Sequence, residues 1–198
     1  MKELHHLLNE LCNSFEKKGH AVTPSLLEPL SEEELKNKCK SWFPAEIPAS
    51  IKDLYEWKGG QRNDAWEEEF PFWFRDMGFI NLEQAESEYK SMNEFYGVEN
   101  TIEADGVLLK DCFPFAAFNG GWFVIPASNN KWSPKFDEPV ICIFQGISQY
   151  YHSIEKMVKT SIECVQHPTW STEEPDIGED VEMIIWKKHN PGIFEEEF

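Results

Sequence analysis

The sixteen residues CFPFAAFNGGWFVIPA, numbers 112–127, decide how this chain folds. Aromatic and β-branched residues crowd both halves of the stretch, as they do in β-strands. Between the halves lies Asn119-Gly120, a residue pair that type I′ hairpin turns prefer, because both central residues of such a turn need a positive φ. The sequence therefore predicts two antiparallel strands, 112–118 and 122–127, joined by this tight turn.

Further strand signals lie on either side of this hairpin. The stretch VICIF at 140–144 shows no polar alternation, which is typical of a central strand covered on both faces. Shorter strands are expected near residues 72–74, 107–109 and 149–151. We therefore expect the middle of the chain to form a mainly antiparallel sheet.

Helical patterns precede and follow the predicted sheet. Six segments carry apolar residues at helical spacing, and they begin near residues 3, 31, 48, 81, 153 and 176. Capping boxes are indicated at Ser31 with Glu34, at Asn81 with Gln84 and at Asp176 with Glu179. In the last helix, Val181, Ile184 and Ile185 are expected to face the core. Helices first, a sheet in the middle and helices last indicate a single α+β domain over residues 1–198, with an acidic helical extension at 169–198.

The stretch IPASIKDLYEWKGGQ, residues 47–61, ends in a glycine pair that could be mistaken for a phosphate loop. A phosphate loop places its glycines before a helix, so that free N–H groups of the first turn point at the anion. Here the glycines follow the helical residues, and the pattern GxxxxGK[ST] does not occur in the chain. Gly59 is therefore predicted to be the left-handed residue that ends a helix.

Charge is the most unusual bulk property of the sequence. Thirty-six acidic residues face 18 basic ones, for a net charge of −18. The excess lies in two blocks, because residues 61–110 hold 12 acids and 4 bases and residues 161–198 hold 10 acids and 2 bases. Direct nucleic-acid binding is disfavoured, since affinity for phosphates is built from Lys and Arg. Two interpretations stay open: a solvated surface, or a surface that attracts a basic partner.

No membrane segment or cofactor site is expected. No apolar run approaches the ~18 residues of a membrane span, and the N-terminal stretch MKELHHLLNEL is too polar for a signal peptide, so the cytoplasm is the expected location. The cysteines are odd in number and no two are spaced as CxxC, which favours free thiols over a metal site or a disulfide framework. They are Cys12, Cys39, Cys112, Cys142 and Cys164.

No catalytic residues are proposed, because GxSxG, HExxH and GxGxxG are all absent. The stretch QRNDAWEEEFPFWFRD, residues 61–76, instead mixes aromatic and acidic residues, as the energetic centres of protein interfaces do. Core packing is favoured for Phe72 and Phe74, whereas for Trp66 core and interface are equally open. The predicted partner-binding residues are Asp64, Trp66, Glu67, Glu68, Glu69 and Trp73. The competing site is the acidic block 173–182 beside Trp170.

Several short segments resemble the signature of the SUKH superfamily, the Knr/Smi-type domains. That signature combines an apolar-proline step and a short helix ending in glycine, a second helix, a hairpin, and a Trp-x-Pro-x-Phe step. Here these read as Ile47-Pro48 with Gly59-Gly60, Asn81-Leu82 with Ala85, Phe113-Pro114-Phe115-Ala116 with Asn119-Gly120-Gly121-Trp122, and Trp132, Pro134 and Phe136. The resemblance covers about residues 20–167. Lys58 stands where the family often has Asn, and 66–74 looks like an insertion specific to this chain.

The resemblance implies a SUKH-like α+β fold and a non-enzymatic binding role. Bacterial members look like immunity proteins that neutralise a cognate toxin, often a nuclease, and fungal members look like regulators of cell-wall synthesis. Together with the acidic charge, this favours a cytoplasmic immunity protein whose partner is a basic toxin domain, with no cofactor. The alternative is a regulatory or scaffold protein of the Knr/Smi type without a toxin partner. A hydrolase that uses carboxylates among Glu67–Glu69 is a third, more distant reading.

Overall fold

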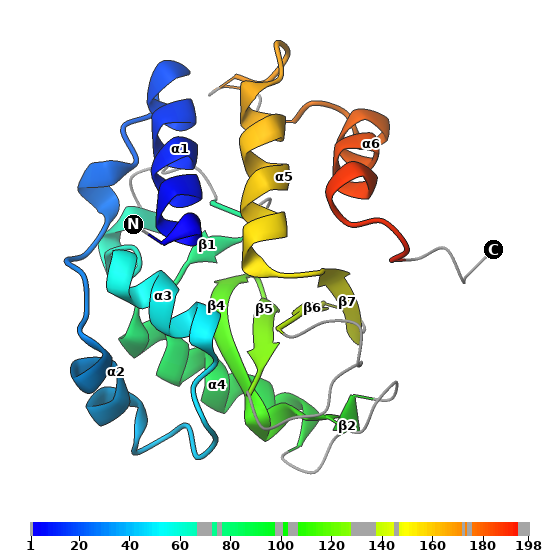
Figure 1. Ribbon diagram of the computed structural model, residues 1–198. Coiled ribbons are helices and arrows are strands. Elements are labelled where there is room, and N and C mark those ends of the chain that lie inside the picture. Colours follow the sequence, from blue (N-terminus) through cyan, green and yellow to red (C-terminus); the bar gives the residue numbers. More distant parts are fainter. Residues whose placement is uncertain are drawn as a thin grey trace.

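The computed structural model describes residues 2–66, 73–74, 77–97, 101–102, 107–127, 138–144, 147–171, 173 and 176–193. Helices and a central antiparallel sheet make this an α+β fold, as the sequence predicts (Figure 1). The helices are α1 (Glu3–Lys17), α2 (Glu32–Cys39), α3 (Ala49–Trp57), α4 (Leu82–Tyr96), α5 (Ile154–Gln166) and α6 (Glu179–His189), with short 3-10 turns η1 (Thr23–Ser25), η2 (Asn63–Trp66) and η3 (Leu109–Asp111).

The main sheet has the strand order β1-β4-β5-β6-β7, and every neighbouring pair is antiparallel. Its strands are β1 (Gly78–Phe79), β4 (Cys112–Phe118), β5 (Gly121–Pro126), β6 (Val140–Ile143) and β7 (Ile147–Tyr151). The predicted hairpin is confirmed: Asn119 and Gly120 join β4 to β5 with φ values of 49° and 75°. Two short strands, β2 (Thr101–Ile102) and β3 (Val107–Leu108), pair with each other outside this sheet.

The strand expected near 72–74 is replaced by one that begins later. Phe74 makes only an isolated bridge with Met77, whose N–H and carbonyl both bond to Phe74 at 3.1 and 3.0 Å. Pairing with β4 starts at Gly78, opposite Ala117. The backbone N–H and carbonyl of Phe74, which a strand would give to the sheet, bond to Met77 instead.

Two of the three predicted capping boxes form, and the third does not. Both capping boxes at Ser31 with Glu34 and at Asn81 with Gln84 are confirmed. The box predicted at Asp176 with Glu179 is wrong, because Asp176 Oδ1 accepts the N–H of Gly178 (2.7 Å) before the helix begins.

Helix α3 takes its N-terminal cap from a residue far along the chain. The carboxylate of Glu138 accepts the N–H groups of Ala49 and Ser50, each at 2.7 Å. A carboxylate at this position also interacts favourably with the positive end of the helix dipole. The start of α3 is thereby tied to the segment that leads into β6.

Glu138→Gln is expected to lower the free energy of unfolding by about 1 kcal/mol, because an amide has one acceptor oxygen where the carboxylate has two. Chemical denaturation of both proteins measures this. Glu46→Gln is the matched control, since Glu46 is exposed in the loop before α3. Equal stability of the two variants would contradict the capping role.

The glycine pair after α3 lies at a crossing of three segments. The positive φ belongs to Gly60 (92°) and not to Gly59, which corrects the sequence-based assignment. The Gly60 carbonyl accepts the N–H of Leu27 (2.8 Å), and the Gly59 N–H donates to the Leu27 carbonyl (3.2 Å). A side chain on Gly59 would meet the Glu28 carbonyl oxygen at 2.6 Å, so glycine is required here by close packing and not by its dihedral angles.

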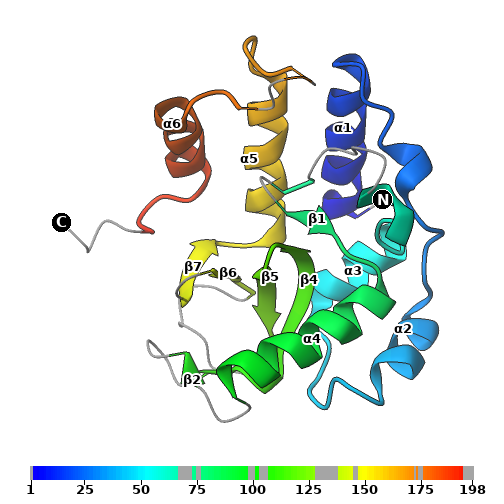
Figure 2. The ribbon, with the colours of Figure 1, turned by 180° about the vertical axis from the view of Figure 1, so that it is seen from behind.

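Helices cover the sheet and share one hydrophobic core with it. Figure 2 shows α4 crossing the sheet over β4, with α1 and α5 running side by side beyond β1. The centre is aromatic, because the ring of Phe113 on β4 lies 5.3, 5.1 and 6.1 Å from those of Trp42, Phe43 and Tyr55. The Tyr55 hydroxyl donates to the Ile80 carbonyl at 2.8 Å, which ties α3 to the segment before α4.

All five cysteines are free thiols, as the sequence predicts. Cys12, Cys39 and Cys112 are buried, and Cys142 and Cys164 are partly buried. Burial raises the pKa of Cys12 and of Cys39 to about 12, because the apolar surroundings disfavour a thiolate. These two side chains therefore serve as small apolar core residues.

Helix α6 is fastened to α5 and β7 mainly by polar contacts. Trp186 Nε1 donates to the Tyr150 carbonyl (2.9 Å), and the buried amide of Asn190 donates to Thr160 Oγ1 (3.4 Å). Ile185 and Trp186 face inward, whereas Ile184 is 70% exposed. The prediction that Ile184 faces the core is thus wrong, because α6 turns Trp186 toward the body in its place.

Glu163 on α5 adds a charged contact to α6 that depends on pH. Its carboxylate lies 2.7 Å from Lys188 Nζ and 2.9 Å from His189 Nε2. Hydrogen bonding to Lys188, assisted by His189, lowers the pKa of Glu163. A lowered folded-state pKa means that the stabilisation is present above the unfolded-state pKa and is lost as pH falls through the folded-state value.

Glu163→Gln is expected to cost about 0.5–1 kcal/mol at pH 7, a small value because the side chain is partly exposed. The difference from the parent protein should begin to fall near the ordinary carboxyl pKa of about 4.3 and should vanish below the lower pKa of Glu163 in the folded protein. Thermal unfolding across this pH range measures it, with Glu10→Gln on the exposed side of α1 as control. A difference that persists at low pH would contradict the ion-pair explanation.

Candidate functional site

The stretch predicted to bind a partner, residues 61–76, is described in part. Asp64 lies in η2, is exposed, and pairs with Arg62 through Nε and Oδ1 at 3.4 Å. The backbone of Trp66 ends the same turn. The Trp66 side chain and the residues Glu67, Glu68 and Glu69 lie outside the described residues. Of the predicted acidic set, Asp64 is therefore the one whose exposure the structure reports.

Trp73 is a core residue. Its side chain has no exposed area, and its ring lies 5.9 Å from Phe15, 5.7 Å from Trp57 and 6.4 Å from Phe74. These contacts join α1 and α3 to the segment before β1. A side chain without exposed area cannot touch a partner while the core stays closed, so its inclusion in the partner-binding set is corrected.

Asn81 fixes the 61–63 segment beside the start of α4. Its Oδ1 caps the helix by accepting the N–H groups of Glu83 and Gln84, both at 3.1 Å. Its Nδ2 donates to the Gln61 carbonyl (2.8 Å) and to Asn63 Oδ1 (2.7 Å). The predicted stretch therefore begins next to the first turn of α4.

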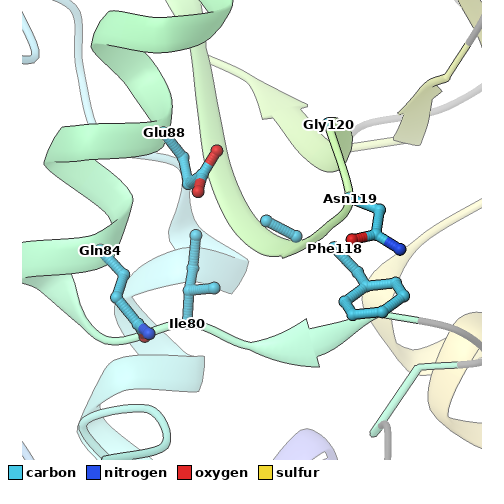
Figure 3. Close-up of a pocket in the computed structure, with 7 residues that line it drawn as sticks. Ile80, Gln84, Glu88, Phe118, Asn119 and Gly120 are labelled. Carbon is cyan, nitrogen blue, oxygen red and sulfur yellow. The ribbon is translucent and has the colours of Figure 1, made fainter. Parts of the chain in front are cut away.

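A pocket of about 200 Å³ opens between α4 and the β4–β5 hairpin. Figure 3 shows Gln84 and Glu88 extending from α4, with Ile80 beside Gln84 and below Glu88, and the hairpin residues Phe118, Asn119 and Gly120 across from them. Its seven lining residues are Ile80, Gln84, Glu88, Ala117, Phe118, Asn119 and Gly120. The pocket thus combines apolar walls with two amide side chains and one carboxylate.

Glu88 is held in place at this pocket by Trp122 on β5. The indole Nε1 of Trp122 donates to Glu88 Oε2 at 2.7 Å. Glu88 makes no other hydrogen bond or ion pair with the described part of the chain. Trp122 is only 5% exposed, so the carboxylate is fixed by a buried ring while its second oxygen keeps its bonding capacity.

Aromatic rings continue this surface toward the end of α4. The ring of Tyr96 lies 6.3 Å from Trp122 and 4.9 Å from Phe95, and Phe95 is 77% exposed. We call residues 80, 84, 88, 94–96 and 117–120 the α4–hairpin surface. A large exposed ring beside carboxylates is a composition that protein interfaces use.

The negative charge of α4 is mostly uncompensated. Lys90, the one basic residue within α4, pairs with Glu86 at 2.5 Å one turn earlier. Glu83, Glu88 and Glu94 have no cationic partner among the residues that the structure describes. Helix α4 therefore carries three carboxylates without a cationic partner among the described residues, and of these Glu88 lines the pocket.

Sequence reasoning identified the parts of this surface but not the surface itself. The Asn81 capping box and the Asn119-Gly120 turn are local signals, and both are confirmed. Glu88 and Trp122 are 34 residues apart, and no local pattern indicates that they bond. The available hint was the spacing of Glu88 and Phe95, which are seven residues apart and share one side of a helix.

The described residues form neither a metal site nor a membrane-spanning helix. No group of three His, Cys, Asp or Glu side chains there could hold a metal ion. No helix among these residues is both long enough and apolar enough to cross a membrane.

Comparison with known proteins does not place the chain in a family, because no protein-family model matches it and no curated protein matches it.

Proposed function

We propose that this chain is a non-enzymatic binding protein, an immunity protein of the SUKH type that neutralises a basic, nuclease-type toxin domain by direct contact in the cytoplasm. The observation that carries the proposal is the α4–hairpin surface, where free carboxylates, an exposed ring and a pocket adjoin in a protein of net charge −18. Such a surface suits a protein partner of opposite charge.

The segments that resemble the SUKH signature meet in space, which supports reading them as one unit. Gly60 packs against the backbone of Ile80 and Asn81, and Asn81 caps α4. Helix α4 then faces the Asn119-Gly120 hairpin across the pocket. Three separate parts of the resemblance thus surround a single site.

A basic partner follows from what a nuclease needs. An enzyme that acts on nucleic acid holds phosphates with Lys and Arg side chains. A carboxylate-rich protein can occupy the same groove and exclude the substrate. Charge complementarity of this kind raises association rates toward about 10⁸–10⁹ M⁻¹s⁻¹ at low salt, and the gain fades as salt rises.

We place the partner contact on the stretch 61–76, centred on Trp66, together with the α4–hairpin surface. The test is calorimetric titration of the protein with the toxin domain encoded by the neighbouring gene. Trp66→Ala should weaken binding by about 2 kcal/mol, the scale of an interface hot spot, and neutralising Glu67, Glu68 and Glu69 should flatten its salt dependence.

The control is Glu173→Gln in the competing C-terminal acidic block, where Glu173 is exposed. Affinity that survives Trp66→Ala in a folded protein but falls when the 173–182 acids are neutralised would move the contact to that block.

A further inference from the structure

We infer that the pocket between α4 and the hairpin receives one lysine or arginine side chain of the protein partner, with its cation bound to Glu88. This rests on the proposed function, and it goes further by naming the chemical group that enters the pocket and the residue that binds it.

The carboxylate of Glu88 has a fixed position. Glu88 Oε2 accepts the indole N–H of Trp122, whose ring is buried, so the carboxylate is oriented before any partner arrives. Its other oxygen makes no bond within the described residues. A preorganised acceptor loses little side-chain freedom on binding, and a cation is the donor that bonds most strongly to it.

The size and lining of the pocket suit one long side chain. Its volume of about 200 Å³ is below the range of roughly 300–1,000 Å³ typical of small-molecule sites, so it has room for one long side chain and not for a larger ligand. Ile80, Ala117 and Phe118 offer apolar contact for the hydrocarbon stem of Lys or Arg.

The charge of α4 around Glu88 is negative. Lys90 is engaged by Glu86, and Glu83 and Glu94 leave the helix strongly negative on either side of Glu88. A phosphate or a carboxylate entering the pocket would meet this field without a cation to bind it. An apolar side chain would leave the second oxygen of Glu88 unused, and a neutral donor would bond to it more weakly than a cation does. Of the three classes, a cation is the one that the pocket complements.

The experiment is an NMR titration of the ¹⁵N-labelled protein at low salt with the blocked peptide Ac-Arg-Arg-Arg-NH2. The matched probe replaces each arginine by citrulline, which has the same shape without the charge. The indole N–H of Trp122 reports directly on Glu88 and is assigned by its loss in Trp122→Phe. We expect the indole signal and the Gly120 amide to shift saturably with the arginine peptide and not with citrulline.

Two variants separate this site from general attraction to an acidic protein. Glu88→Gln keeps an acceptor for Trp122 but loses the charge, and it should weaken binding about fivefold or more. Glu83→Gln removes the same charge five residues away, at an exposed side chain outside the pocket lining that pairs with no cation among the described residues, and should weaken binding less than twofold, roughly the effect of long-range screened charge. Equal weakening in both variants, or equal binding of both peptides, would overturn the inference.

The outcome is separable from the proposed function. Saturable binding at Glu88 without any toxin partner would keep the pocket assignment and reject the immunity role. Tight binding of the neighbouring toxin that Glu88→Gln leaves unchanged would keep the immunity role and reject this pocket as the place where a cation enters.

Discussion

Gly60→Ala is expected to lower the free energy of unfolding by roughly 3 kcal/mol or more, from backbone strain and overpacking together. The φ of Gly60 is +92°, and an added Cβ would lie 2.5 Å from Asn81 Cα and 2.6 Å from Asn81 N. Both contacts are with backbone, which cannot rotate aside. The Gln61 N–H bond to the Phe79 carbonyl (2.8 Å) and the start of α4 would therefore shift as well.

Gly19→Ala is the matched control for this substitution. Gly19 has almost the same φ, +91°, but a Cβ there would meet no atom within 4 Å. It should show the cost of the dihedral angle alone, about 1–2 kcal/mol. Urea denaturation of both variants gives the difference between them, which measures the close approach to Asn81. Equal losses would mean that the crossing of segments at Gly60 does not constrain the fold.

Trp73→Ala is expected to cost about 3–5 kcal/mol, a large part of the stability of an ordinary domain. The ring has no exposed area and joins Phe15 of α1 to Trp57 of α3. Removing it would leave a cavity where two helices meet the sheet. Loss of cooperative thermal unfolding, or a steep fall in its midpoint, checks this.

Trp73→Phe distinguishes a core role from a binding role. Trp73 Nε1 is buried and has no hydrogen-bond partner among the residues that the structure describes, so phenylalanine removes this donor while it keeps an aromatic ring. We expect a cost below about 2 kcal/mol and unchanged affinity for the partner. A folded Trp73→Phe protein that no longer binds would restore Trp73 to the interface.

Sequence reasoning succeeded where the determining contacts are local. The hairpin turn at Asn119-Gly120 and the capping boxes at Ser31 and Asn81 depend on residues at most three positions apart, and the structure has all of them. The free state of the thiols also followed from the number and spacing of the cysteines.

Sequence-based prediction failed where the determining contact is made by a residue far away in the chain. Helix α3 is capped by Glu138, which is 89 positions from Ala49, and no signal near Pro48 reveals it. The left-handed glycine is Gly60, whereas Gly59 is required by its close packing against the Glu28 carbonyl. Ile184 was placed inward by its spacing, but docking of α6 through Trp186 and Asn190 leaves it exposed.

For the candidate site, too, the sequence predicted the local composition but not the tertiary contacts. A run of aromatic and acidic residues has the same composition whether it packs inward or faces solvent, so the 61–76 stretch could not separate buried Trp73 from exposed Asp64. The pocket depends on tertiary structure alone, since it needs Gln84 and Glu88 of α4 beside the hairpin some 30 residues later. The sequence indicated carboxylates next to aromatic rings in the 61–76 stretch, and α4 and the hairpin were not part of that prediction.

The measurement that tests the central claim most directly is inhibition of the toxin domain encoded by the neighbouring gene. The activity of the purified toxin is followed while this protein is added, and survival is scored when both are expressed in the same cells. We predict that activity falls to background near one equivalent and that co-expression protects the cells. Full toxin activity at a large molar excess, with no protection of cells, would contradict the account.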